Sequence, residues 1–296
     1  IPSRLVGSEM CIRDRNIAGI AGSEKYFVAL LPALAAKGVH CEFINVYKKK
    51  DKAIAQEFSQ MLEEEGIKVH EIPITTYASI PLLFKINSIY KKGKFDCIHA
   101  HLIYSDFWCS AIKKYINRKM VVFSTKHGYQ HKYYVDYCMK PEQLPKTLYY
   151  RLFRFAHKTM DRTYSCSYGL QEFYTRAGLI KKDEIDVIQH GFDYPEPDFD
   201  NLSQYKFSEH QLIIAGRLVK RKGQHFVIEI LPNLIKKFPK IKLLLLGTGV
   251  YESEFRRLVK EKSLENHVDF MGYKTNVVDY MACLLYTSPS PRDEKV

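Results

Sequence analysis

Short apolar segments typical of β-strands alternate with amphipathic helical segments along most of this chain, and this alternation limits its fold more than any other feature. The segment 23–37 has apolar residues at 27, 30, 31 and 34, a helical spacing, and Gly38 follows as a stop. In the first half we expect strands at 41–47, 68–72, 95–99, 120–125, 162–165 and 185–188. We expect helices at 23–37, 53–65, 80–91, 104–115, 148–160 and 169–177. Strands that alternate with helices in this way form a parallel sheet with helices on both faces, so the fold class is α/β.

The alternation stops at an aperiodic segment and then starts again near Phe207. Residues 193–201 hold two prolines and four acidic residues, which predicts a linker at 193–207. Beyond it we expect strands at 211–215, 241–246 and 267–271, and helices at 224–238, at 253–262 and from 277. The first domain would then span 16–192 and the second 208–282. The second is shorter than the usual size of about 100 to 150 residues, and we expect it to be incomplete.

The two ends of the chain do not continue these patterns. Residues 1–15 and 283–296 have no helical or strand period, and they resemble translated sequencing-adapter read-through at the ends of assembled metagenomic reading frames. We therefore expect both ends to be foreign to the fold and the authentic sequence to be a fragment, truncated at both ends.

Composition narrows the setting of the chain. No apolar run approaches the roughly 18 residues of a membrane-spanning helix. The seven cysteines include no Cys-x-x-Cys pair, so we expect neither a disulfide framework nor a zinc ribbon, and a reduced, cytosolic compartment. The net charge is +12, and the segment 113–162 holds 12 Lys and Arg against 3 Asp and Glu. Such a patch suits nucleic acid, an anionic membrane face or a phosphorylated substrate, and composition does not choose among them.

A basic loop at 216–223, with the sequence GRLVKRKG, is the strongest local signal for a binding site. It follows an apolar strand and opens a long helix, where ligands of open α/β sheets bind and where free N–H groups attract anions. Arg217 offers a planar fork to phosphate oxygens, and Lys222 offers a flexible point charge. A solvated basic loop that only caps the helix stays open as the alternative.

Other segments extend this signal in a fixed order. They are GSEK at 22–25, FDCIHAH at 95–101, TKHG at 125–128, SCSYG at 165–169, VIQHGFD at 187–193, PKIKLLLLGTG at 239–249 and LENHVDFMG at 264–272. Together with the basic loop they resemble the retaining glycosyltransferases of family 4 over nearly all of residues 17–282. The resemblance implies two facing Rossmann-like domains of the GT-B type, with 16–192 on the acceptor side and 208–282 binding the nucleotide-sugar.

The resemblance also implies roles for residues that would hold the donor. Arg217 and Lys222 would bind the donor diphosphate and neutralise the charge of the leaving group, so that no metal or other cofactor is required. Gly22 would belong to a glycine-rich loop that approaches the phosphates, although a plain turn into a helix is the alternative. The nucleotide itself would lie against Gly216, Gly247 and Gly249.

Two histidines are candidates on the acceptor side. By the resemblance, His127 is the active-site histidine that hydrogen-bonds the sugar or acceptor, and His101 lines the acceptor cleft. Alternatives from the residues alone are a metal pair of His127 with His131 on a helix, or of His99 with His101 on a strand. Gly128 directly after His127 argues against the helix, and we expect no metal.

Residues 148–158 interleave aromatic and cationic side chains on a predicted helix. This pattern suits docking at an anionic membrane surface that carries lipid-linked acceptors. An ordinary amphipathic helix that packs its aromatic residues on the sheet is the alternative. We find no nucleic-acid-binding motif and expect no nucleic-acid partner.

The sequence therefore predicts a glycosyltransferase that moves a sugar from a nucleotide-sugar donor to a saccharide or lipid-linked acceptor, with retention of configuration. Its setting would be surface polysaccharide or glycolipid synthesis, in the cytosol or peripheral at the inner membrane face. No matched pair of acids is readable, which disfavours hydrolysis. Two alternatives stay open: a nucleotide-sugar epimerase of the same fold, and a truncated fragment that binds nucleotide without turnover, since CLLYTSPSPRDEKV follows Ala282 in place of the family's Glu, seven residues, Glu motif.

Overall fold

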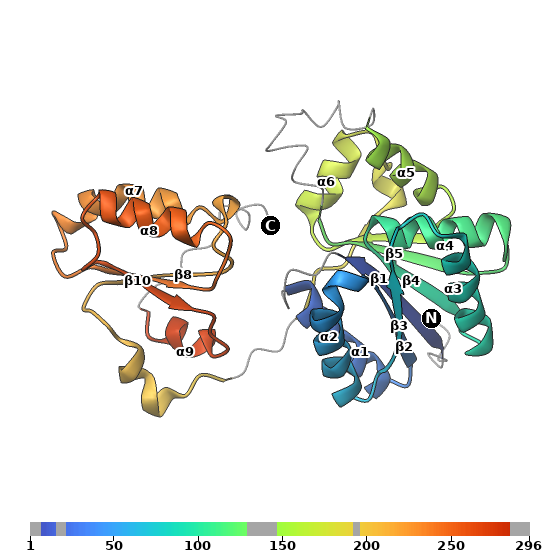
Figure 1. Ribbon diagram of the computed structural model, residues 1–296, viewed down its shortest axis with the longest axis horizontal. Coiled ribbons are helices and arrows are strands. Elements are labelled where there is room, and N and C mark those ends of the chain that lie inside the picture. The colour runs from blue at the N-terminus through green and yellow to red at the C-terminus, as the bar shows by residue number, and fades with distance from the viewer. Residues whose placement is uncertain (1–6, 16–21, 129–146, 192–195, 285–296) are drawn as a thin grey trace. The chain divides into compact units, whose positions relative to one another are not determined.

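The computed structural model describes residues 7–15, 22–128, 147–191 and 196–284 (Figure 1). The chain divides into two compact units, the first ending at Phe192 and the second beginning at Asp193. Each unit is built around its own parallel sheet, of seven strands in the first and three in the second, counted over the described residues. The predicted α/β fold class is confirmed.

The first unit contains a sheet with the strand order β3-β2-β1-β4-β5-β6-β7, and every neighbouring pair is parallel. The strands are β1 (Ser8–Arg15), β2 (His40–Lys48), β3 (Lys68–Ile74), β4 (Cys97–His101), β5 (Val122–Lys126), β6 (Arg162–Ser165) and β7 (Asp186–Val187). From β1 the next strands, β2 and β3, are added on one side, and β4 to β7 are then added on the other side of β1. The strand order therefore reverses between β1 and β4. Ligands of open α/β sheets bind beyond the carboxyl ends of strands at such a point.

Helices cover both faces of this sheet (Figure 1). They are α1 (Gly22–Ala36), α2 (Lys52–Glu64), α3 (Ile80–Lys92), α4 (Ile103–Tyr115), α5 (Leu148–His157) and α6 (Tyr168–Arg176). One apolar cluster packs α3 and α4 on the sheet around Ile86 and Trp108, and another packs α1 and α2 around Phe27 and Phe58. Both faces of the central strands are therefore buried.

The expectation that residues 1–15 lie outside the fold is wrong for Ser8–Arg15, which form the central strand β1 between β2 and β4. Met10, Cys11 and Ile12 are fully buried. Met10 and Ile12 join the cluster beneath α3 and α4, whereas Cys11 joins the cluster beneath α1 and α2. Only Met10, Cys11 and Ile12 form the apolar run of a strand buried on both faces. The flanking Glu9 and Arg13 are charged residues that the fold pairs with His99 and Glu24, so the sequence showed no strand period there.

The second unit repeats the pattern on a smaller scale. Its strands β8 (Gln211–Ala215), β9 (Lys242–Leu246) and β10 (Val268–Gly272) pair in parallel in the order β10-β9-β8. Its helices are α7 (Gln224–Ile235), α8 (Glu252–Glu261) and α9 (Val277–Ala282). Leu243 and Leu245 of β9 face α7 and α8, and Leu244 and Leu246 face α9.

Part of the predicted linker packs on the second unit. Phe199–Tyr205 form a 3₁₀ helix, η5, whose Tyr205 ring lies 4.7 Å from the Tyr280 ring of α9. The Asn276 side-chain amide donates to the Tyr205 hydroxyl at 2.9 Å. Residues 199–205 therefore complete the face of the small sheet that α9 covers.

Candidate functional site

Three histidines meet at the carboxyl ends of the strands of the first unit. His101 is the last residue of β4, His127 follows β5 directly and His190 comes three residues after β7. Because all these strands are parallel, their carboxyl ends share one edge of the sheet. His101 Nδ1 lies 2.9 Å from His127 Nε2, and His127 Nδ1 lies 3.1 Å from His190 Nε2. We call His101, His127 and His190 the histidine row.

Aromatic side chains of α1 close the histidine row from one side. The Tyr26 ring lies 4.0 Å from the ring of His190 and 5.3 Å from that of His127. The edge of the Phe27 ring meets His101, with the ring centres 4.6 Å apart. These contacts remove water from the imidazoles and leave them in apolar surroundings.

Burial sets the charge of the histidine row. It lowers the pKa of His101 and of His127 well below the ordinary value, and the neighbouring cationic and imidazole groups lower both further. Burial also lowers the pKa of His190. The row is therefore uncharged at neutral pH, and each ring has one N–H donor and one acceptor nitrogen. Since both nitrogens of His127 face other histidines, His127 can bind a substrate hydroxyl only by exchanging one of these partners.

A buried ion pair holds the end of β5 just before His127. Lys126 Nζ lies 2.5 Å from Asp106 Oδ2 of α4, and the Ser124 hydroxyl donates to Asp106 Oδ1 at 2.6 Å. Both charged side chains are almost fully buried. After His127, the Tyr174 hydroxyl donates to the Gly128 carbonyl at 2.8 Å. His127 is thus anchored on both sides along the chain.

A second buried ion pair joins β1 to the first turn of α1. Arg13 pairs with Glu24, and both side chains are almost completely buried. The Arg13 guanidinium also lies 5.6 Å from the centre of the Phe27 ring. Its positive charge is one of the groups that lower the pKa of His101 and His127.

Among the described residues, one group of side chains has the types expected of a metal site: Cys11, His99 and His101, whose ligand atoms all lie within 4.8 Å of one another. The chemistry does not fit a metal. His99 uses both ring nitrogens, Nδ1 with Glu9 Oε1 at 2.6 Å and Nε2 with Thr125 Oγ1 at 2.8 Å. Burial raises the pKa of the Cys11 thiol well above its usual range, which keeps it protonated and a poor ligand.

Gly22 is a further sequence candidate in the first unit. Gly22 is the exposed first residue of α1, and a Cβ placed there would meet no atom within 4 Å. The residues before it, 16–21, lie outside the described part of the chain, as does His131. Gly22 thus lies at the N-terminus of α1, and its contact with the donor phosphates stays a prediction.

In the second unit, the loops after β8 and β9 press against each other backbone to backbone. The Gly216 N–H donates to the Leu246 carbonyl at 2.8 Å. A Cβ on Gly247 would lie 2.3 Å from the Gly216 oxygen, and a Cβ on Gly249 would lie 2.3 Å from the Leu218 oxygen. Gly247 and Gly249 are thus needed for loop packing, whatever ligand these loops bind.

The basic loop 216–223 follows β8 and therefore lies at the carboxyl ends of the strands of the second unit. Arg217 follows Gly216 with an exposed side chain, and its carbonyl accepts from the Gln224 side-chain amide at 3.0 Å. Lys222 is exposed and precedes Gly223, whose left-handed backbone (φ 79°) starts α7. Two cations therefore stand beside the N-terminus of a twelve-residue helix, where an anion is favoured.

Sequence reasoning assigned His101 and His127 to the acceptor side but missed His190, Tyr26 and the Arg13 and Glu24 pair. His190 carried a usable signal, because it follows a predicted strand by a few residues, as His127 does. Tyr26 and Glu24 lie on the first turns of a helix that follows the central strand, and the resemblance implied a role there only for Gly22.

Family models match both halves of the chain. The model for Glycosyltransferase Family 4 matches residues 20–194, and the model for Glycosyl transferases group 1 matches residues 202–294. Among the described residues, no helix has both the length and the apolar character needed to cross a bilayer.

Individual relatives share a modest fraction of their sequence with this chain. A capsular polysaccharide biosynthesis glycosyltransferase of Staphylococcus aureus, CapH, is 22% identical over 76% of this chain and 60% of its own length. A GDP-mannose-dependent monoacylated alpha-(1-6)-phosphatidylinositol monomannoside mannosyltransferase of Corynebacterium glutamicum is 33% identical over 37% of this chain and 30% of its own length. The chain thus spans less than two thirds of either relative.

Among solved structures, Anabaena HepE in complex with UDP and glucose superposes with a TM-score of 0.68 at 18% identity, covering 93% of this chain and 72% of that one. This likeness concerns the fold. The family model, in contrast, covers more than half of the chain directly. The chain belongs to Glycosyltransferase Family 4.

Proposed function

We propose that this chain belongs to a retaining glycosyltransferase that moves a sugar from a nucleotide-sugar donor to an acceptor hydroxyl in surface polysaccharide or glycolipid synthesis. Membership in the family over both halves of the chain carries this proposal. It is supported by polar groups at the carboxyl ends of the strands in each unit: the histidine row in the first, and Arg217 with Lys222 in the second.

In this proposal the second unit binds the donor. Arg217 and Lys222 hold the diphosphate, and their charge stabilises the nucleoside diphosphate as the glycosidic bond breaks. Because these cations supply the positive charge, the reaction needs no metal. The loops around Gly216, Gly247 and Gly249 carry the nucleotide.

The histidine row serves the sugar and acceptor. His127 exchanges its contact with His190 for a hydroxyl of the sugar or acceptor and keeps its contact with His101. A neutral imidazole suits this role, because it can donate to or accept from a hydroxyl without introducing a charge. His101 then fixes the orientation of the His127 ring.

The acceptor is a saccharide or a lipid-linked saccharide, and the protein works peripherally at the anionic cytoplasmic face of a membrane. The names of the capsular and phosphatidylinositol mannoside relatives support this class of acceptor. The helix α5 buries Tyr150 and Phe153 in the core and leaves Leu148, Arg151 and Arg154 exposed. Among the described side chains of α5, these exposed cations are available to a membrane, whereas Tyr150 and Phe153 are not.

Nucleotide binding tests the donor site. We expect Arg217→Ala to weaken the affinity for UDP or GDP by about 10- to 100-fold, since a hydrogen bond to a charged group is worth about 1.5 to 3 kcal/mol. Titration calorimetry measures the affinity. Arg257→Ala on α8 removes the same charge from an exposed position of the same unit and serves as the control. Equal losses in the two variants would contradict the assignment.

Product analysis separates the transferase from its alternatives. Incubation with nucleotide-sugars, with and without saccharide acceptors, should give a longer saccharide only when an acceptor is present. An epimerised nucleotide-sugar formed without acceptor would identify an epimerase. Binding without any product would identify a non-catalytic nucleotide-binding chain.

A further inference from the structure

A cationic hollow lies at the opposite edge of the first unit from the histidine row. Its volume is about 610 Å³, and it lies between the C-terminal ends of α4 and α5. Four cations line it, and we call it the basic pocket: Lys113, Lys114, Arg118 and Lys158. Its one acidic residue is Asp161.

The basic pocket is separate from the candidate active site. Lys113 and Lys114 stand in the last turn of α4, and Asp161 stands just before β6, so the pocket lies at the amino ends of the strands. His127 follows the carboxyl end of β5, a strand of five residues that spans about 16 Å. A ligand in the basic pocket would not contact the reacting groups.

The basic pocket has more positive charge than the nearby carboxylate and helix C-terminal ends neutralise. Asp161 pairs with Lys113 and also accepts the Val122 N–H at 2.7 Å. In the part of the chain that the structure describes, Lys114, Arg118 and Lys158 have no carboxylate within ion-pair distance. The C-terminal ends of α4 and α5 contribute about half a negative charge each. About two positive charges are left over.

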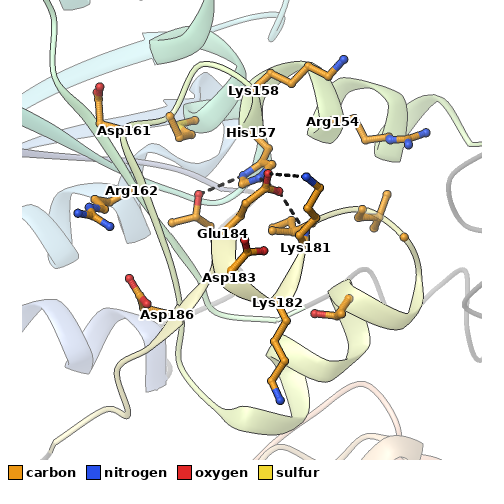
Figure 2. A pocket seen from close by; sticks show the side chains of 16 residues that line it. Arg154, His157, Lys158, Asp161, Arg162, Lys181, Lys182, Asp183, Glu184 and Asp186 are labelled. Atoms are coloured by element: carbon orange, nitrogen blue, oxygen red, sulfur yellow. Dashed lines mark hydrogen bonds and ion pairs between the residues drawn. The ribbon is translucent and has the colours of Figure 1, made fainter.

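A neighbouring hollow of about 870 Å³ shares Lys158 and Asp161 with the basic pocket but not its excess of positive charge. Five Lys and Arg residues and four Asp and Glu residues line it. Figure 2 shows His157, Glu184 and Lys181 joined to one another on one wall, while Arg154 and Lys158 point away from them. Its charges are nearly balanced internally, so the unmet positive charge lies in the basic pocket.

Aromatic rings hold one of the cations in place. Lys114 Nζ lies 4.9 Å from the centre of the Phe155 ring and 5.4 Å from that of Tyr115. Cation–π contacts of this kind keep the ammonium beside the pocket without neutralising it. The Tyr115 ring is 71% exposed, as an aromatic residue at a lipid interface would be.

We infer that the basic pocket binds a phosphate group. A phosphodiester carries one negative charge and a phosphomonoester about 1.5 to 2, which matches the unmet charge. Arg118 offers a planar fork to two phosphate oxygens, and Lys114 and Lys158 offer point charges. The phosphate belongs either to an anionic lipid headgroup or to a free phosphate compound, and the experiment below distinguishes these sources. The site does not depend on donor binding at Arg217.

The test compares the whole chain with Lys114→Ala/Arg118→Ala, both exposed positions. One arm measures flotation with phosphatidylcholine vesicles with and without phosphatidylglycerol. The other titrates inorganic phosphate and follows backbone amide shifts at 113–118 and 158–161 by NMR. If the source is a lipid, binding to the anionic vesicles falls about 25-fold in the double variant, about fivefold per cation. If the source is free phosphate, the amide shifts appear without vesicles and vanish in the double variant.

Two controls make the outcome decisive. Lys49→Ala/Lys50→Ala removes two exposed charges from the same unit, outside the pocket, and should change vesicle binding much less. Arg217→Ala should leave both arms unchanged, which separates this site from the proposed donor site. The inference is overturned if neither probe binds, or if the two double variants lose binding equally, because a diffuse surface charge would then explain the result.

Discussion

His101 Nδ1 and His127 Nε2 lie 2.9 Å apart, although 26 residues separate them in the sequence. The parallel register of β4 and β5 pairs His101 with Thr125 and thereby brings the end of one strand beside the start of the next loop. Burial keeps both rings neutral. A proton on either ring would place an unsolvated charge beside the other, so the arrangement is sensitive to acid.

The first unit should lose stability as the pH falls from about 7 to about 5. A buried histidine with a lowered pKa binds fewer protons in the folded chain than in the unfolded chain, where its pKa is about 6.5. Unfolding then takes up protons, so the free energy of unfolding decreases on acidification, by up to about 1.4 kcal/mol per pH unit for each such histidine. Urea denaturation followed by the fluorescence of Trp108, the only tryptophan, measures it.

Substitutions identify the source of this acid sensitivity. His127→Gln should make the dependence less steep, because it removes one of the buried histidines whose pKa is lowered. The partners of Glu9 and Glu42 outweigh burial and lower the pKa of both carboxyls, so these acids titrate below the pH range used. An unchanged slope in His127→Gln would place the acid sensitivity elsewhere.

The Asp106 and Lys126 pair should show strong energetic coupling. Lys126→Met leaves the Asp106 carboxylate buried with only the Ser124 hydroxyl as its described partner, which should cost about 3 to 5 kcal/mol. Asp106→Leu alone should cost a similar amount, because Lys126 then loses its counter-ion. The double variant should cost much less than the sum, since two unpaired charges are removed together. Additive losses in urea denaturation would show that the pair acts as two independent groups.

The alternation of strands and helices was readable from sequence because apolar periodicity reports burial directly. The predicted strand 162–165 is β6 without change, and the predicted helix 53–65 is α2 shifted by one residue. The strand predicted at 95–99 lies at Cys97–His101, two residues later, so His101 itself belongs to the strand. These elements depend on local sequence, so their presence is predictable. Their observed ends differ from the predicted ends by up to two residues, because apolar periodicity does not locate helix and strand ends.

The histidine row was only partly readable because it depends on strand order. His127 and His190 are 63 residues apart, and they meet because β5, β6 and β7 are neighbours in the sheet. Periodicity predicts that a strand exists but not which strand lies beside it. The strand predicted at 185–188, seen as the two-residue β7, marked His190 as following a strand, but nothing in its pattern placed that strand beside β6.

Gly249→Ala should destabilise the second unit. The added Cβ would lie 2.3 Å from the Leu218 oxygen and 2.7 Å from its nitrogen, so the backbone of one loop must move. Such overpacking costs about 2 to 3 kcal/mol. Amide hydrogen exchange of β8 and β9 measures the loss, because Trp108 reports only on the first unit.

Gly272→Ala is the matched control for this substitution. Gly272 has a positive φ of 69° but open space around its Cβ position, so only backbone strain of about 1 kcal/mol is expected. A Gly249→Ala loss no larger than that of Gly272→Ala would show that the loops after β8 and β9 are not in close contact.

Ile12→Ala tests whether β1 is the centre of the first sheet. Ile12 is fully buried between Ile44 and Ala100 of the neighbouring strands, so truncation should cost about 2 to 5 kcal/mol. Ile188→Ala removes the same atoms from a side chain that is 56% exposed and should change stability by about 0.5 kcal/mol or less. Trp108 fluorescence in urea compares the two. Equal small losses would mean that this segment takes no part in the fold, as its lack of periodicity first indicated. A large loss of stability for Ile12→Ala alone would show that β1 is part of the folded sheet.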